Sequence, residues 1–161
     1  MSEELEKIRE VAALQSLSPS ACLQEVRDFE AFTGLRLPPF LRQVYIEVAA
    51  GCFGPGYGLL PLTRHPTDEA EETALELYQS FRSADPEDPG WVWPAYLLPI
   101  CDWGCAIRSC VDCSSEEGVM VRFDPNDHGP GVPWASAFKV ESPSFRAWIG
   151  DWASGTLSFN L

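Results

Sequence analysis

Residues 97–113 read LLPICDWGCAIRSCVDC, and this stretch combines two β-favouring runs with four of the six cysteines in the chain. Asp102-Trp103-Gly104 lies between the runs and is typical of a bend that joins two strands. The cysteine spacing is C-x3-C-x4-C-x2-C, whereas a structural zinc site usually has two short cysteine pairs separated by a longer insert. We therefore interpret the four cysteines as sheet core rather than as a metal or redox centre, and we expect no metal or cofactor.

Strand-like patterns continue from this stretch toward the C-terminus. Strands are predicted over four segments, residues 96–102, 106–113, 119–124 and 135–140. Val119, Val121 and Phe123 occupy alternate positions in the third segment, which is the period of a sheet with one buried face. The pattern therefore predicts a meander, with a hairpin turn at residues 114–118.

Helical periodicity dominates the first half of the chain. Helices are predicted at about residues 3–16, from Ser18-Pro19 to Gly34, from Pro38-Pro39 to a cap at Gly51, and at about 68–82 after Thr67. A short strand is predicted over residues 57–62, and a last helix from Ser142-Pro143 to about Gly155. This order predicts an α+β fold, with N-terminal helices followed by a largely antiparallel sheet flanked by helices.

Size and composition favour one folded unit. The chain has 161 residues, of which 45% are hydrophobic and 22% charged, so residues 1–161 are expected to form a single domain. The start MSEELEKIRE does not resemble a signal peptide, and the apolar run at residues 91–101 is too short to span a bilayer. We therefore expect a cytoplasmic location with reduced thiols. The net charge of −13 disfavours direct binding to nucleic acid or to a membrane.

Acidic residues are concentrated between positions 66 and 90. Eight acids accompany a single base there, so this stretch holds over half of the net charge. It is either a solvated face or a patch that attracts a basic partner. The nearby Trp91 and Trp93 are either a lid over the sheet or an aromatic anchor at an interface. The candidate partner-binding residues are Asp68, Glu69, Glu72, Glu76, Asp85, Glu87, Asp88, Trp91 and Trp93.

Catalytic motifs are scarce. The chain has two histidines, His65 and His128, and neither a G-x-S-x-G elbow nor a P-loop. Residues 124–131, DPNDHGPG, are spaced like a calcium loop, but the twelfth position is Ala135, where a bidentate Glu is required. We expect no enzymatic activity, and a small thiol enzyme remains the least favoured alternative.

Three segments in order resemble the SUKH superfamily. They are LPPFLRQVYIEVAAGCFGPGYGLLPL at residues 37–62, LLPICDWGCAIRSCVDCSSEEGVMVRFD at 97–124 and SPSFRAWIGDW at 142–152. The resemblance spans roughly residues 20–152. The superfamily includes Smi/Knr-like fungal regulators and bacterial immunity proteins. The GCFGPG loop departs from the Asn-Gly-Gly type of turn that the family more often shows, and an acidic helix-loop insert lies at about residues 64–95.

The resemblance implies a central antiparallel sheet flanked by helices and a role without catalysis. Bacterial members resemble antidotes that bind a cognate toxin of a polymorphic or contact-dependent system, often a nuclease, in the cytoplasm. The expected partner is therefore a protein toxin with a basic surface. A regulatory scaffold of the Smi/Knr type is the alternative, and a monomer and a weak dimer both remain open.

Overall fold

The computed structural model describes every residue except 16, 66–69, 71 and 159–161. Within the described residues the fold is α+β, as predicted, and has five helices and one four-stranded antiparallel sheet. The helices are α1 (Glu3–Ala12), α2 (Leu23–Thr33), α3 (Pro39–Glu47), α4 (Ala74–Arg82) and α5 (Phe145–Ala153). The strands are β1 (Leu97–Gly104), β2 (Ile107–Asp112), β3 (Met120–Phe123) and β4 (Phe138–Ser142).

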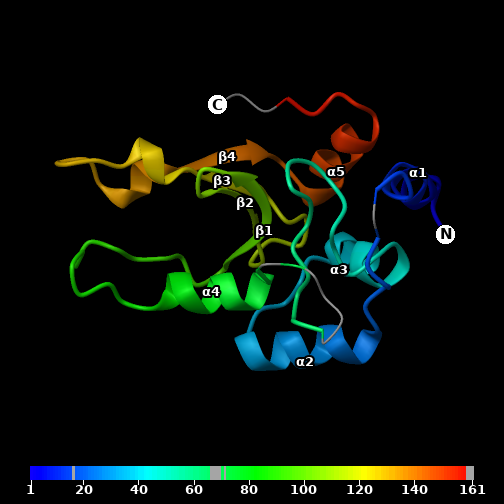
Figure 1. Cartoon of the computed structure of the whole chain (residues 1–161), viewed down its shortest axis with the longest axis horizontal. Coiled ribbons are helices and arrows are strands. Elements are labelled where there is room, and N and C mark those ends of the chain that lie inside the picture. Colours follow the sequence, from blue (N-terminus) through cyan, green and yellow to red (C-terminus); the bar gives the residue numbers. More distant parts are fainter. Residues whose placement is uncertain (16, 66–69, 71, 159–161) are drawn as a thin grey trace.

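The sheet is a simple meander in the order β1-β2-β3-β4, and every neighbouring pair is antiparallel. Figure 1 shows α1, α3 and α5 at the right of the sheet and α4 below it. Two loops, one after α4 and one between β3 and β4, extend to the left beyond the helices. The two loops therefore project from the end of the sheet opposite α1, α3 and α5.

The core consists of aromatic and aliphatic side chains, and the buried Tyr45 hydroxyl within it is hydrogen-bonded. Its largest fully buried side chains include Trp93, Trp148 and Tyr45. The Tyr45 hydroxyl donates to the Leu60 carbonyl at 2.7 Å, and burial raises its pKa far above the usual range. A buried phenol with a backbone acceptor meets the requirement that buried polar groups be paired.

The four cysteines of the central stretch have different surroundings. Cys101 and Cys110 are buried in β1 and β2, which confirms the sheet-core interpretation for these two. Cys105 is exposed in the tight β1–β2 turn, and Cys113 follows β2 half-buried. Burial raises the pKa of the Cys101 and Cys110 thiols and raises that of Cys113 to about 12. These three thiols therefore stay protonated at neutral pH.

The predicted start of the second helix at Ser18-Pro19 is wrong. The carbonyl of Pro19 accepts from the Ala50 N–H, and the Ala21 N–H donates to the Tyr45 carbonyl, both at 2.9 Å. These long-range bonds hold the segment extended beside the end of α3, so α2 begins only at Leu23. Its cap is Cys22, whose sulfur accepts the Glu25 N–H while the Glu25 carboxylate accepts the Cys22 N–H.

Other element ends also differ from the predictions. The first helix ends at Ala12 rather than near residue 16, and α3 is capped by Val48 rather than Gly51. Gly51 has another role, since its φ is +141° and an added Cβ would lie 2.8 Å from the Pro61 nitrogen. The fourth strand begins at Phe138, not at residue 135, because Trp134–Ala137 form a 3-10 turn.

The predicted strand at residues 57–62 is reduced to one bridge, between Leu59 and Cys101. Around it, the Leu60 N–H donates to the Ile100 carbonyl at 2.8 Å and the Tyr57 N–H to the Asp102 carbonyl at 2.9 Å. This segment therefore occupies the outer edge of β1 without forming a regular strand.

Candidate partner-binding surface

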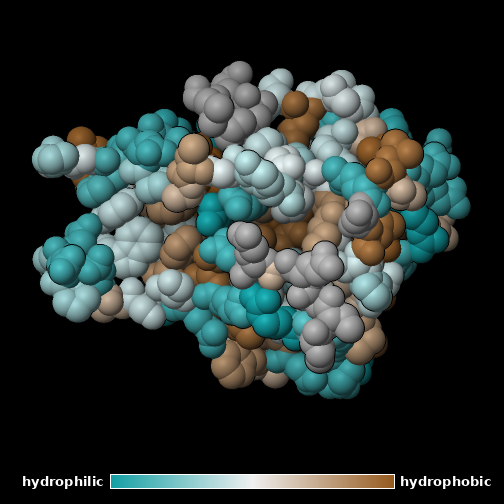
Figure 2. Space-filling model, in the orientation of Figure 1, coloured by the Kyte–Doolittle hydropathy of each residue, from teal (hydrophilic) through white to brown (hydrophobic). Residues whose placement is uncertain are grey.

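Two loops that are far apart in the sequence form one projection, which we call the arm. It consists of residues 83–92, after α4, and residues 124–137, between β3 and β4. Figure 1 shows both loops, green and yellow, pointing the same way, and Figure 2 shows them as two largely hydrophilic lobes with a notch between their tips. The arm therefore projects beyond the end of α4, away from α1, α3 and α5.

Aromatic rings form the base of the arm. Phe123 on β3 is paired with Phe138 on β4, so their rings share one face of the sheet. The Trp93 ring packs against both, with its centroid 5.1 Å from that of Phe123 and 5.3 Å from that of Phe138. The ring centroid of Phe81, on α4, lies 4.6 Å from that of Trp93. The indole N–H of Trp93 donates to the Leu97 carbonyl at 2.7 Å. The arm is thus anchored to the sheet by a packed cluster, which limits its motion.

A polar clasp joins the two loops above this base. The indole N–H of Trp134 donates to the Asp88 carboxylate at 2.7 Å across 46 residues of sequence. The Trp134 ring also contacts Trp91 edge-on at 4.7 Å and stacks on His128 at 3.7 Å. His128 in turn has its Nε2 atom 3.9 Å from the same Asp88 carboxylate. These contacts make the two loops one unit.

Exposed carboxylates occupy the tip of the arm. Asp85 and Glu87 are exposed, and Asp85 accepts the Glu87 N–H at 2.9 Å, which fixes the turn. No ion pair joins either of them to another described residue. On the second loop Asp127 is paired with Lys139 at 2.8 Å. Of the exposed carboxylates of the arm, those without an ion pair therefore lie on the first loop.

The carboxylates near the start of α4 are paired within the chain. Arg64 contacts Glu76 through two parallel hydrogen bonds of 2.8 Å, and this arginine lowers the pKa of Glu76 to about 2. Arg108 is nearly buried and contacts Glu72 at 3.2 Å and Asp102 at 2.8 Å. Two of the predicted partner-binding acids are thus engaged by arginines of their own chain.

The remaining candidates divide into three groups. Asp68 and Glu69 lie outside the described residues, as does the predicted cap Thr67, and α4 is capped instead by Thr73. Trp91 is half-buried in the arm. Trp93 is 2% exposed, so it forms the lid over the sheet and does not present a surface anchor.

The sequence prediction missed the second loop of the arm. His128 and Trp134 fall in a Pro- and Gly-rich segment in which no partner-binding residue was predicted. The sequence signal was Trp134 itself, since a tryptophan in such a loop needs a packing partner. Exposed apolar side chains also lie on the arm, with Val92 at 70% and Val132 at 40% exposure.

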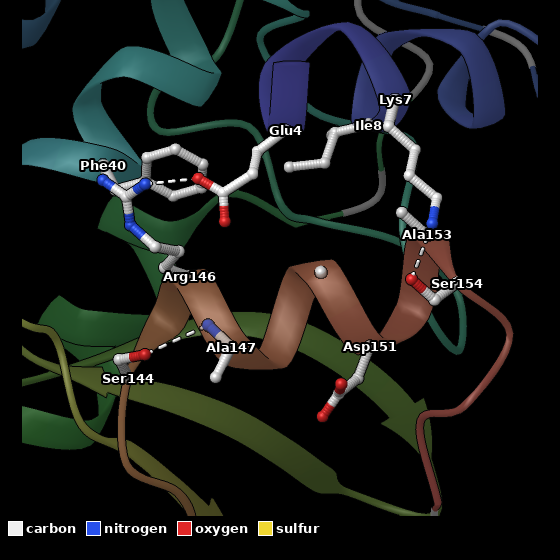
Figure 3. A pocket seen from close by; sticks show the side chains of 11 residues that line it. Glu4, Lys7, Ile8, Phe40, Ser144, Arg146, Ala147, Asp151, Ala153 and Ser154 are labelled. Carbon is white, nitrogen blue, oxygen red and sulfur yellow. Dashed lines mark hydrogen bonds and ion pairs between the residues drawn. The ribbon is translucent and has the colours of Figure 1, made fainter. Parts of the chain in front are cut away.

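A separate cavity of about 440 Å³ lies between α1 and α5 (Figure 3). Two of its charged side chains form a pair, since Arg146 binds Glu4 and also lies over the Phe40 ring, and Lys7 donates to Ser154 at 2.9 Å. These pairs join the two helices. The cavity therefore belongs to helix packing and contains no arrangement that points to chemistry.

Features of metal or membrane sites are not seen in the described part of the chain. No group of three or more His, Cys, Asp or Glu residues there is placed to hold a metal ion. No described helix is long and apolar enough to cross a bilayer.

The fold and this surface together define a class: an α+β domain with a helix-covered antiparallel sheet and a rigid, acidic two-loop projection. The model of the SMI1 / KNR4 family (SUKH-1) matches residues 21–151, which is most of the chain, so the protein belongs to that family. The expected superfamily resemblance is therefore confirmed. A comparison with curated proteins finds no match.

Proposed function

We propose that this protein is a non-catalytic immunity protein that neutralises a cognate bacterial toxin in the cytoplasm by binding it. Its membership of the SMI1 / KNR4 family supports a role of this kind. The observation that carries the proposal is the arm, in which unpaired Asp85 and Glu87 stand on a rigid aromatic base. A preformed surface loses little conformational entropy on binding, so its contacts contribute more fully to affinity.

Charge accounts for the speed of such binding. A nuclease toxin is basic where it contacts phosphates, and a protein of net charge −13 attracts it from a distance. Glu72 and Glu76 contribute less than the charge count implies, because Arg64 pairs with Glu76 and Arg108, which also pairs with Asp102, offsets part of the Glu72 charge. The exposed acids of the arm are therefore the proposed contact point, and the valines beside them supply apolar area.

Co-expression with the toxin encoded next to it in the native genome tests the proposal. We expect the protein to restore growth, and unchanged killing would contradict an immunity role and favour the regulatory alternative. In purified form, reversing Asp85 and Glu87 to lysine should lower the association rate and flatten its dependence on salt.

A matched control has the same change in net charge at the other end of the molecule. Glu6 and Glu10 are exposed on α1, far from the arm (Figure 1). Their reversal to lysine should change the association rate much less than the arm reversal does. Equal effects of the two double variants would show that total charge, and not the arm, governs association.

A further inference from the structure

The two edges of the sheet differ in whether they are occupied. The outer edge of β1 is covered by the segment around Leu59, whose neighbours donate to β1 carbonyls. On the opposite side β4 is the last strand, and no described segment pairs with its outer edge. Figure 1 shows β4 along the upper border of the sheet. An unoccupied edge offers a row of backbone donors and acceptors to another chain.

The register identifies which groups point outward. The Asp124 N–H donates to the Ala137 carbonyl at 2.8 Å, so these two residues form a hydrogen-bonded pair of the antiparallel ladder. Such pairs alternate along the ladder, which directs the backbone groups of Lys139 toward β3. The N–H and C=O groups of Val140 and the C=O group of Phe138 consequently point away from the sheet, whereas the Phe138 N–H donates to the Ala135 carbonyl within the 3-10 turn.

The usual protection of an edge strand is weakened here. Natural edges are often guarded by a lysine whose charge resists an incoming strand. Lys139 is the candidate guard, but its ammonium group is held by Asp127 at 2.8 Å. Next to it, the Val140 side chain is 72% exposed, so an apolar contact is also available. Beyond Val140 the register shifts, which ends the straight part of the edge.

We infer that β4 accepts an extended, basic segment of the protein partner as an added strand. This inference rests on the proposed function, because it names how the same partner is contacted. The occupant is basic rather than a second copy of this chain, since two copies of net charge −13 would repel each other. The second arm loop leads directly into β4, so a strand added along β4 would lie next to the arm.

The pattern of the added strand follows from the sheet. The residue opposite Val140 lies on the face that Val140 shares with Phe138, so it is apolar. The residues that flank it in the added strand point to the other face of the sheet or lie beyond its end. Basic side chains at these positions complement the net negative charge of this protein. Backbone hydrogen bonds supply the affinity and the alternating side chains supply the selectivity, as in other strand-addition complexes.

Two nine-residue peptides serve as probes, one of alternating lysine and valine and one of alternating glutamate and valine. Amide hydrogen exchange, read residue by residue by NMR, reports on the edge. The Val140 amide should exchange rapidly in the free protein, because no described group accepts its N–H. It should slow by about tenfold when the lysine peptide is at about ten times its Kd. The glutamate peptide should leave it unchanged.

Variants at one position separate backbone pairing from side-chain contact. Val140→Pro removes the outward N–H without removing a bond to β3, and proline is tolerated at such edge positions. It should abolish edge protection by the lysine peptide, whereas Val140→Thr, which keeps the N–H, should retain it. Thermal unfolding checks that both variants fold, and the exchange measurement on the unaltered chain does not depend on either.

Three results would overturn the inference: slow exchange of the Val140 amide in the free protein, no slowing with the lysine peptide, or undiminished binding by Val140→Pro. If the peptide test fails while the protein still rescues growth, the edge is not the contact and the immunity role stands. If the peptide binds at the edge but the wild-type protein gives no rescue, the immunity role fails and the edge site stands.

Discussion

The acids near the start of α4 and the acids of the arm tip come from one short stretch of sequence, yet they have opposite roles. Glu72 and Glu76 are held by arginines and fix the start of α4 to the sheet and to the loop before it. Asp85 and Glu87, about ten residues later, have no such partner within the described residues and remain exposed. The difference shows that local charge density does not measure the charge available to a partner.

The largest expected effect concerns the base on which the arm stands. Trp93→Ala should lower the free energy of unfolding by about 3–5 kcal/mol, because it removes a fully buried ring and leaves a cavity. Val92→Ala, next to it but 70% exposed, should change stability by no more than about 0.5 kcal/mol. Urea unfolding of both variants measures this. Similar losses of stability in the two variants would mean that the buried Trp93 ring does not anchor the arm.

The clasp between the loops should have an intermediate effect. Trp134→Phe retains a stacking ring but removes the donor to Asp88, and it should lower the free energy of unfolding by about 1–2 kcal/mol. The loss should also speed hydrogen exchange at the Gly90 and Trp91 amides, which bond to Asp88. Exchange that stays as slow as in the wild type would contradict a clasp that holds the two loops together.

Truncation of one acid from each region tests the comparison directly. Glu76→Ala removes an ion pair and half of the Thr73 capping box, so it should lower the free energy of unfolding by about 1 kcal/mol. Glu87→Ala should be neutral within about 0.5 kcal/mol. Thermal or urea unfolding distinguishes them, and an equal loss from both would remove the distinction between structural and available acids.

The smallest expected effect is a dependence on pH. The pKa of Glu76 is lowered from 4.5 to about 2 by Arg64, so the pair stabilises the fold above pH 4.5. That contribution is lost as the pH falls through about 2, and it stays below about 1 kcal/mol because both groups are exposed to solvent. The stability difference between wild type and Glu76→Gln should therefore shrink on acidification from pH 5 toward 2. A constant difference would show that Arg64 does not stabilise the ionised form.

Much of the fold was predictable, because the relevant signals are local. The alternation of Val119, Val121 and Phe123 and the helical periodicity before residue 50 predicted the type and order of the elements. The exact ends were not predictable where distant residues set them. The start of α2 depends on bonds to Tyr45 and Ala50, which no local pattern near Ser18 reveals.

The candidate site was predictable only in part. Its first loop was identified by charge, but the second loop was not, because the Asp88–Trp134 contact joins residues 46 positions apart. Trp91 and Trp93 both lie where the acidic stretch meets an apolar run. Only the packed structure distinguishes the half-buried Trp91 ring from the buried Trp93 ring.

What the sequence by itself determined is the class of fold, the family resemblance and the negative charge of the molecule, since all three depend on residue type and short-range spacing. The tertiary structure alone decided which carboxylates pair with Arg64 and Arg108, which tryptophan is buried and which edge of the sheet is open. The physical reason is that pairing and burial are properties of neighbours in space, and chain folding brings those neighbours from distant positions.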